Sequence, residues 1–123
     1  MKTKYIRQNG VQIAVIQNEE VIIRDAQAAL DLIATVLYEK DCDRIALPKT
    51  ALPEDFFVLS TGIAGAVLQK FVSYRCKLAI FGDYSCYTSK PLKDFIYESN
   101  KSRRVFFVAD EAEAVEKLAY VRN

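Results

Sequence analysis

The chain has 123 residues, a length that fits one domain with a single buried core. Its 17 basic and 16 acidic residues nearly cancel, so composition does not support nucleic-acid binding, which needs excess Lys and Arg on one face. Three cysteines without a CxxC motif, and no histidine, speak against a zinc site and a disulfide framework and favour a cytoplasmic location. No segment approaches the roughly 20 apolar residues of a membrane span, and no apolar leader opens the chain.

Two antiparallel strands are predicted near the amino terminus. Residues 4–6 and 11–16 flank Asn9-Gly10, a dipeptide that accepts the positive φ angles of a tight hairpin turn. Residues 21–23 are apolar and predict a further short strand.

A first helix is predicted after Asp25, whose carboxylate can cap it, and it is expected to end near Lys40. Apolar residues spaced at i, i+3, i+4 and i+7 predict one buried stripe, formed by Leu30, Ile33, Ala34 and Leu37. Residues 45–47 then form a short strand that Pro48 stops, because proline cannot donate a ladder hydrogen bond.

A loop through Pro53 leads to a single turn over residues 54–59 and then to a second helix. The turn is expected to place Phe56 and Phe57 on the core, and Ser60 or Thr61 is the expected helix cap. The apolar positions of this helix are Ile63, Val67, Leu68 and Phe71.

Residues 78–81 are continuously apolar, which is typical of a strand covered on both faces. Ser89 is the expected cap of a third helix with Pro91 in its first turn. Residues 105–108 form the last strand, and Asp110 followed by Glu113 resembles a capping box at the start of a final helix. The apolar residues of these two helices are Leu92, Phe95, Ile96, Val115 and Leu118.

The alternation of strands and helices predicts one α/β domain over residues 1–123. It has a mixed sheet with a parallel core, an antiparallel hairpin at one edge and about four helices. Ligands of such sheets gather beyond the carboxyl ends of the strands, so we expect a site in loops 48–61, 82–89 and 109–110.

Ser60-Thr61-Gly62 is the first candidate site, because helix amino termini favour anions and glycine leaves room for close approach. The alternative is an ordinary helix cap. Asp55 and Asp83 are expected at the same rim, where two carboxylates near hydroxyls can bind a cation or act as acid and base. Equally, Asp83 can cap a turn while Asp55 is merely solvated.

Three further groups complete the candidates. Ser85 and Tyr87 belong to a hydroxyl-rich loop suited to hydrogen-bonding a partner or small ligand. Lys101, Arg103 and Arg104 form the one dense basic cluster of the sequence, which can solvate the turn into the last strand, and Arg103 can alternatively reach an anion at the rim. One ring of each Phe pair, at 56–57 and 106–107, is a candidate for exposure to a partner. The cysteines are interpreted as buried hydrophobes, and no catalytic residue, metal ligand or cofactor is assigned.

Nearly the whole chain resembles a bacterial family known only as a domain of unknown function, which carries no activity over. The segments that carry this likeness are residues 55–57, 60–65, 68–71, 82–83, 92–100 and 106–107. The order of elements also resembles the STAS domain of anti-sigma factor antagonists and sulfate transporters. In that resemblance, Ser60-Thr61-Gly62 is similar to the Ser-Ser-Gly or Ser-Thr-Gly motif that a partner kinase phosphorylates.

The leading hypothesis is therefore a non-catalytic regulatory module that binds a protein partner, such as a regulatory kinase or an anti-sigma-like factor. Phosphate at Ser60 or Thr61 would add about −1.5 to −2 charges to that interface. The competing hypothesis is a binder of a phosphate-bearing small molecule, or a weak enzyme, that uses Asp55 and Asp83. A homodimer through an exposed Phe or the edge hairpin is a third.

Overall fold

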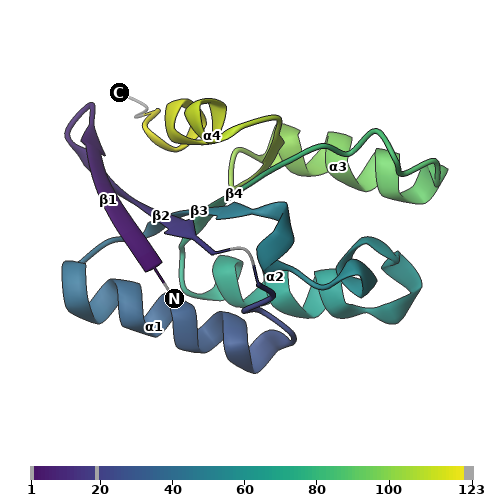
Figure 1. The fold of residues 1–123 in the computed structure, drawn as a ribbon, viewed down its shortest axis with the longest axis horizontal. Helices are drawn as coiled ribbons and strands as arrows, with labels where there is room; N and C mark the ends of the chain where they lie inside the picture. The colour runs from purple at the N-terminus through teal and green to yellow at the C-terminus, as the bar shows by residue number, and fades with distance from the viewer. Residues whose placement is uncertain (1, 19, 121–123) are drawn as a thin grey trace.

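The computed structural model describes residues 2–18 and 20–120, and within these ranges it holds one five-stranded sheet and four α-helices (Figure 1). The strands lie side by side in chain order, and they are β1 (Lys2–Gln8), β2 (Val11–Gln17), β3 (Arg44–Pro48), β4 (Lys77–Phe81) and β5 (Val105–Val108). β1 and β2 are antiparallel, and each later strand is parallel to its predecessor. The predicted α/β fold, with its mixed sheet and edge hairpin, is confirmed.

The hairpin turn follows from its two central residues. Asn9 has a φ of 54° and Gly10 a φ of 79°, and Gln8 pairs directly with Val11 across the turn. Two successive positive φ angles give the type I′ geometry that matches the twist of paired strands.

Three helices cover one face of the sheet. α1 (Ala26–Lys40), α2 (Ile63–Ser73) and α3 (Lys90–Ser102) each connect a strand to the next parallel one. Because such crossovers are right-handed and the strands are added in order, all three helices pack on the same side. α4 (Glu111–Leu118) follows β5 and is the one helix among the described residues that packs on the opposite face (Figure 1).

Alternation along the strands divides the apolar side chains between two layers. In β5, for example, Phe107 belongs to the larger layer under α1, α2 and α3, whereas Phe106 belongs to the layer under α4. Ala46 and Ala79 lie in this second layer, and their small side chains leave room for α4 against β3 and β4. No helix among the described residues is long and apolar enough to cross a membrane.

The predicted helix caps at Asp25, Ser89 and Asp110 are confirmed. Asp25 accepts a hydrogen bond from the Ala28 N–H at 2.9 Å, and Ser89 accepts one from the Leu92 N–H at 3.4 Å. The Asp110 carboxylate accepts from the Glu113 N–H at 2.8 Å. Each bond satisfies an amide that has no partner within its helix.

Two expectations about the amino-terminal half are wrong. Residues 21–23 form no strand; the N–H groups of Ile22 and Ile23 instead donate to the Ala51 carbonyl at 3.0 and 3.1 Å. The fully buried stripe of α1 is offset from the predicted one by about one residue. Its members are Ala29, Leu32, Ile33 and Val36.

The expectation of exposed Phe rings is also wrong. Phe56 is 0% exposed and Phe57 is 4% exposed, because the turn that carries them packs onto the larger layer. Phe106 and Phe107 do point to opposite faces of the sheet, but α4 covers one of those faces and α3 the other, so both are buried.

Candidate functional site

The carboxyl ends of the parallel strands carry a compact polar–aromatic cluster. Phe57 lies in a short 3₁₀ helix, η2 (Glu54–Phe57), and its ring stacks on that of Tyr87 with centroids 4.9 Å apart. The Lys49 ammonium lies 4.5 Å from the Tyr87 centroid and 5.5 Å from that of Phe57. The Tyr87 hydroxyl donates to Glu54 at 3.2 Å. We call Lys49, Glu54, Phe57 and Tyr87 the rim cluster.

Charge and burial act together on the rim cluster. Burial alone would lower the pKa of Lys49. The hydrogen bond and charge of Tyr87, together with the negative charge of Glu54, outweigh burial, so that the pKa is raised. Burial raises the pKa of the Tyr87 phenol, and Lys49 opposes that shift. Lys49 therefore stays a cation and Tyr87 a neutral donor at physiological pH.

Gly82 lets the rim cluster sit close to the end of β4. A Cβ placed on Gly82 would lie 2.7 Å from the Cβ of Lys49, a distance that side chains do not reach without displacing the backbone. Glycine is therefore required here by close approach.

Asp83, which follows Gly82, serves the turn rather than a ligand. Its carboxylate accepts a hydrogen bond from the Ser85 N–H at 2.8 Å. Hydrogen bonds from Ser85 lower the pKa of this carboxyl group, with a smaller contribution from Lys49. This is the turn-capping alternative considered from sequence.

Ser60 and Thr61 lie at the predicted place but have a different local role. They belong to a 3₁₀ helix, η3 (Leu59–Thr61), and the residue that caps α2 is Gly62, which has a φ of 79°. The expectation that a hydroxyl caps α2 as its N-cap is therefore wrong. The Thr61 hydroxyl lies 2.8 Å from the carbonyls of both Asp55 and Val58 and accepts from the Ile63 N–H at 3.3 Å.

The two hydroxyls are consequently not equivalent. Thr61 is tied to η2, η3 and the start of α2, whereas the exposed Ser60 side chain makes no hydrogen bond to another described residue. Of the two candidate phosphoacceptors, Ser60 is the one whose oxygen is available.

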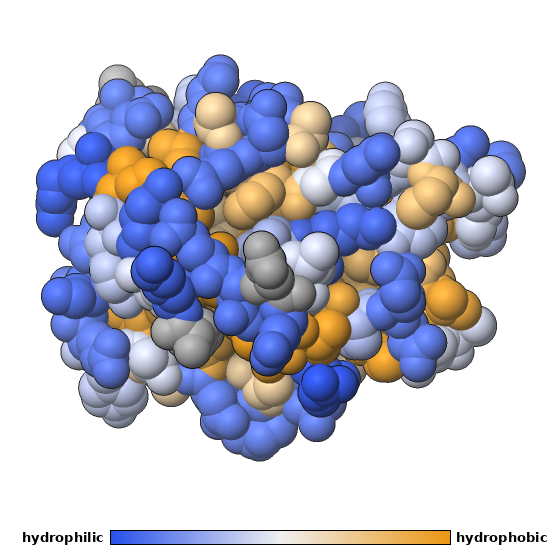
Figure 2. Space-filling view, in the orientation of Figure 1, coloured by the Kyte–Doolittle hydropathy of each residue, from blue (hydrophilic) through white to orange (hydrophobic). Residues whose placement is uncertain are grey.

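The chain segment that contains Ser60 carries no charge. Residues 56–69 contain no Asp, Glu, Lys or Arg, although 27% of the chain is charged. Figure 2 shows hydrophobic side chains at the lower right, where Figure 1 draws the segment that leads into α2. We call the exposed residues within positions 56–69 the uncharged surface; they are Val58, Ser60, Thr61, Gly62, Gly65, Ala66 and Gln69.

The structure brings together only some of the predicted site residues. Asp55 and Thr61 meet through the Asp55 carbonyl, and Asp83 meets Ser85. No contact between described residues joins the Asp55 and Asp83 carboxylates, and no group of three Asp, Glu or Cys side chains among the described residues is arranged to hold a metal ion. A shallow groove of about 330 Å³ beside Ser85 and Tyr87 is open to solvent.

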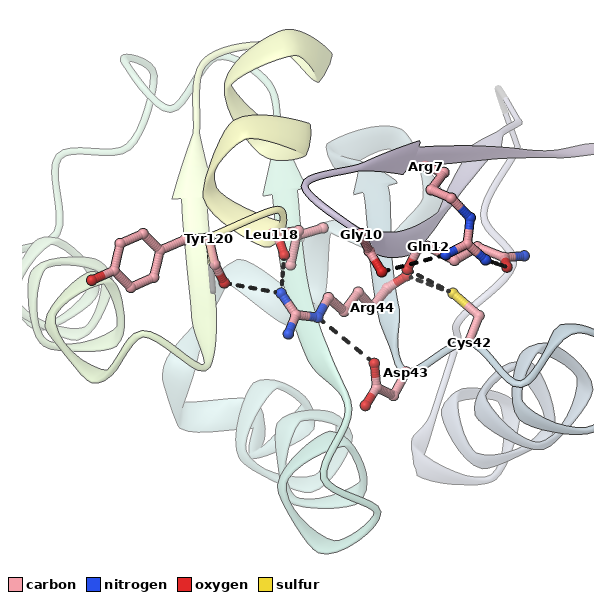
Figure 3. Close-up of polar contacts among 8 residues, drawn as sticks. All are labelled: Arg7, Gly10, Gln12, Cys42, Asp43, Arg44, Leu118 and Tyr120. Carbon is pink, nitrogen blue, oxygen red and sulfur yellow. Dashed lines mark hydrogen bonds and ion pairs between the residues drawn. The ribbon is translucent and has the colours of Figure 1, made fainter. Parts of the chain in front are cut away.

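Arg103 lies at the opposite end of the sheet, because it ends α3 immediately before β5 begins. The same end carries Arg44, which sequence reasoning missed (Figure 3). Arg44 donates to the Leu118 carbonyl and, at 3.1 Å, to the Tyr120 carbonyl, and it pairs with Asp43 at 3.7 Å. A cation at a helix carboxyl terminus stabilises it, so Arg44 fixes α4 to the sheet.

A family model described as a domain of unknown function, DUF4180, matches residues 8–118. The matched range runs from the end of β1 to the last residue of α4, and it includes the rim cluster and the uncharged surface. No curated protein and no solved structure matches the chain.

Proposed function

We propose, from the premise that this chain belongs to the DUF4180 family, that it is a non-catalytic regulatory module that binds a protein partner through the uncharged surface. Phosphorylation of Ser60 releases or reorders the partner. The observation that carries the proposal is the exposed, unbonded Ser60 hydroxyl within a charge-free stretch of an otherwise charged chain.

Composition supports the choice of a protein partner. The cores of protein–protein interfaces are depleted in charged side chains, and residues 56–69 have none. Gly62, Gly65 and Ala66 have small side chains, so a partner can approach the backbone of α2 closely. The resemblance of the element order to the STAS domain supports a regulatory kinase or an anti-sigma-like factor as partner.

The switch follows from charge. A phosphate on Ser60 would add about −1.5 to −2 charges to a chain segment that has none. It would also stand beside the amino terminus of α2, where the helix dipole favours an anion. The phosphorylated state is therefore compatible with the fold. Binding to it would be unfavourable, because an apolar partner surface would remove water from the phosphate and an acidic one would repel it.

The competing ligand hypothesis has less support. Asp83 and Thr61 already engage neighbouring backbone groups, and the rim cluster pairs its own polar atoms. A homodimer through the edge of β1 stays a prediction that rests on the unpaired side of that strand.

The test compares proteins that co-purify with the full chain from its native host. Wild type and Ser60→Ala are expected to retain the same partner, whereas Ser60→Asp and Ala66→Arg lose it. Thr88→Asp is the matched control, because it adds the same charge to an exposed residue at the same end of the sheet but outside the uncharged surface. Intact mass of the purified protein reports the phosphate.

Two results would contradict this function. Equal partner recovery from all five proteins would show that the uncharged surface is not the interface. Loss of the partner in Thr88→Asp as well would show that net charge, rather than a local contact, determines recovery.

A further inference from the structure

The second notable surface lies at the amino-terminal end of the sheet, away from the proposed partner surface. The turns that lead into β4 and β5 and the end of α4 enclose an open basin of about 940 Å³. Six basic side chains line it, namely Arg75, Lys77, Lys101, Arg103, Arg104 and Lys117. Glu116 is the one acidic residue in the lining that the structure describes. More than a third of the basic residues of a nearly neutral chain therefore gather in one place.

None of these six cations is held in an ion pair with another described residue. The ion pairs among the described residues join Lys4 to Glu111, Arg44 to Asp43, and Lys90 to Asp94, and none includes a basin cation. Like charges gathered without partners repel one another and raise the local electrostatic potential. A positive local potential of this kind attracts an anionic ligand.

The pKa of Lys77 is lowered by burial and by its positively charged neighbours. Burial and the positive charges of Arg44, Arg104 and Arg103 lower its pKa, and Asp43 opposes the shift only in part. The cations at this end are therefore close enough to act on one another.

The backbone adds a separate observation. Four non-glycine residues in the described chain have positive φ: Asn9, Asp41, Arg75 and Arg103. Asn and Asp adopt this conformation readily, but it costs an arginine about 1 kcal/mol or more. Arg75 and Arg103 occupy equivalent positions, each between a helix and the next strand, and both line the basin. The turn conformation favours Gly or Asn. A positive charge beside a helix carboxyl terminus is favourable, and at Arg75 and Arg103 that charge also lines the basin.

An aromatic side chain stands next to the charges. The Arg103 guanidinium lies 5.2 Å from the centroid of the Tyr120 ring, and that tyrosine is 52% exposed. A planar group with a negatively charged tail can contact the ring and the cations at the same time.

We propose that this basin binds a small polyanion of the nucleoside polyphosphate class, with the phosphates held by Arg75, Arg103 and the neighbouring lysines. Arginine forms paired hydrogen bonds to phosphate oxygens, and several cations are needed to match two or more phosphates. The volume is in the range of small-molecule sites, which are about 300–1,000 Å³. The concave shape within one chain favours a compact ligand over an extended nucleic-acid backbone, which would require a longer basic track.

The test is calorimetric titration of the full chain with ATP, inorganic tripolyphosphate, inorganic phosphate and a 20-nucleotide single strand, at two salt concentrations. ATP and tripolyphosphate are expected to bind with an affinity that falls as salt rises, and inorganic phosphate at least tenfold more weakly. The double variant Arg75→Asn, Arg103→Asn is expected to lose at least tenfold in affinity for both. Asparagine keeps the positive φ conformation, so the variant is expected to fold, which circular dichroism checks.

The control is Lys2→Gln with Arg24→Gln, which removes two exposed positive charges that do not line the basin. It is expected to change affinity less than twofold. Equal losses in the two double variants would overturn the proposal, because they would reduce it to net charge. Binding of the single strand in preference to tripolyphosphate would overturn it in favour of nucleic acid, and absence of binding by ATP and tripolyphosphate at millimolar concentration would also overturn it.

Discussion

The two ends of the sheet treat their polar groups in opposite ways. At the carboxyl end, Lys49 contacts Tyr87, Tyr87 donates to Glu54, and Asp83 accepts from Ser85. At the amino end, six cations line one basin, two of them lie over tyrosine rings, and none forms an ion pair with another described residue. Polar groups that satisfy one another hold a loop in place, whereas cations without a counter-charge are available to an anion from outside the chain. The conspicuous polar loops are therefore mainly structural, and the unremarkable turns hold the stronger ligand candidate.

The largest expected effect tests whether the segment at the carboxyl ends of the strands is packed into the core. Phe56 is 0% exposed, and its ring meets Phe57 edge to face with centroids 5.0 Å apart. Phe56→Ala is expected to lower the free energy of unfolding by about 3–5 kcal/mol, because it removes a fully packed ring and leaves a cavity. Urea denaturation measures this. Tyr38→Ala, at a side chain that is 91% exposed, is expected to stay within about 0.5 kcal/mol of wild type. A loss below about 1 kcal/mol for Phe56→Ala would mean that the rim packs loosely.

A second prediction concerns the wall of the basin. Cys76 is 3% exposed there, and burial raises the pKa of its thiol to about 11. Between pH 9 and 11 the unfolded thiol is ionised and the folded one is not, so the unfolded state binds fewer protons and stability falls as pH rises. Relative to Cys76→Ala, wild type is expected to lose up to about 3 kcal/mol over this interval. Denaturant unfolding at a series of pH values measures the difference.

Other groups titrate in the same range, and comparison with Cys76→Ala removes their contribution. Parallel curves for the two proteins would show that the folded thiol ionises near its ordinary pKa. The basin cations would then dominate over burial at this position, and the contrast between the two ends would be sharper than proposed.

The smallest effect separates a true helix cap from an apparent one at the same end of the sheet. Asp110→Ala is expected to cost about 1 kcal/mol, because the Glu113 amide loses its acceptor. Ser60→Ala is expected to change stability by less than about 0.5 kcal/mol, because Gly62 occupies the cap position of α2. Thermal and urea unfolding of both variants measures the pair. A larger loss for Ser60→Ala than for Asp110→Ala would restore the serine to a structural role.

Sequence alone was sufficient where the signal is local. Asn9-Gly10 specifies a turn by its own φ preferences, and Asp25, Ser89 and Asp110 cap helices by contacts within three residues. The strand order then follows from chirality and short connections.

It failed where the deciding partner lies far along the chain. Residues 21–23 look like a strand, but their amides bond to the Ala51 carbonyl, and nothing near them in sequence indicates that carbonyl. At Ser60 the contrary signal was present, because Gly62 favours a positive φ that ends one helix and begins another.

The basin was hidden for a third reason. Its cations lie between residues 75 and 117 in the sequence. They meet in space because the amino ends of the parallel strands β4 and β5 lie side by side at one end of the sheet. The cluster of Lys101, Arg103 and Arg104 is visible in the sequence, but the overall charge near zero gives no sign that Arg75, Lys77 and Lys117 join it. The rule that ligands bind beyond the carboxyl ends of parallel strands also points to the opposite end of the sheet from the basin.

The single helix on the back of the sheet has a consequence for synthesis. Strands β2 to β5 all leave the ribosome before α4, so Ile13, Val15, Phe106 and Val108 have no cover until the helix that follows them emerges. A nascent chain paused at this point presents a broad apolar face to the cell, which favours association with chaperones or with other incomplete chains. Completion of about two helical turns then closes the molecule, and Arg44 secures the last of them.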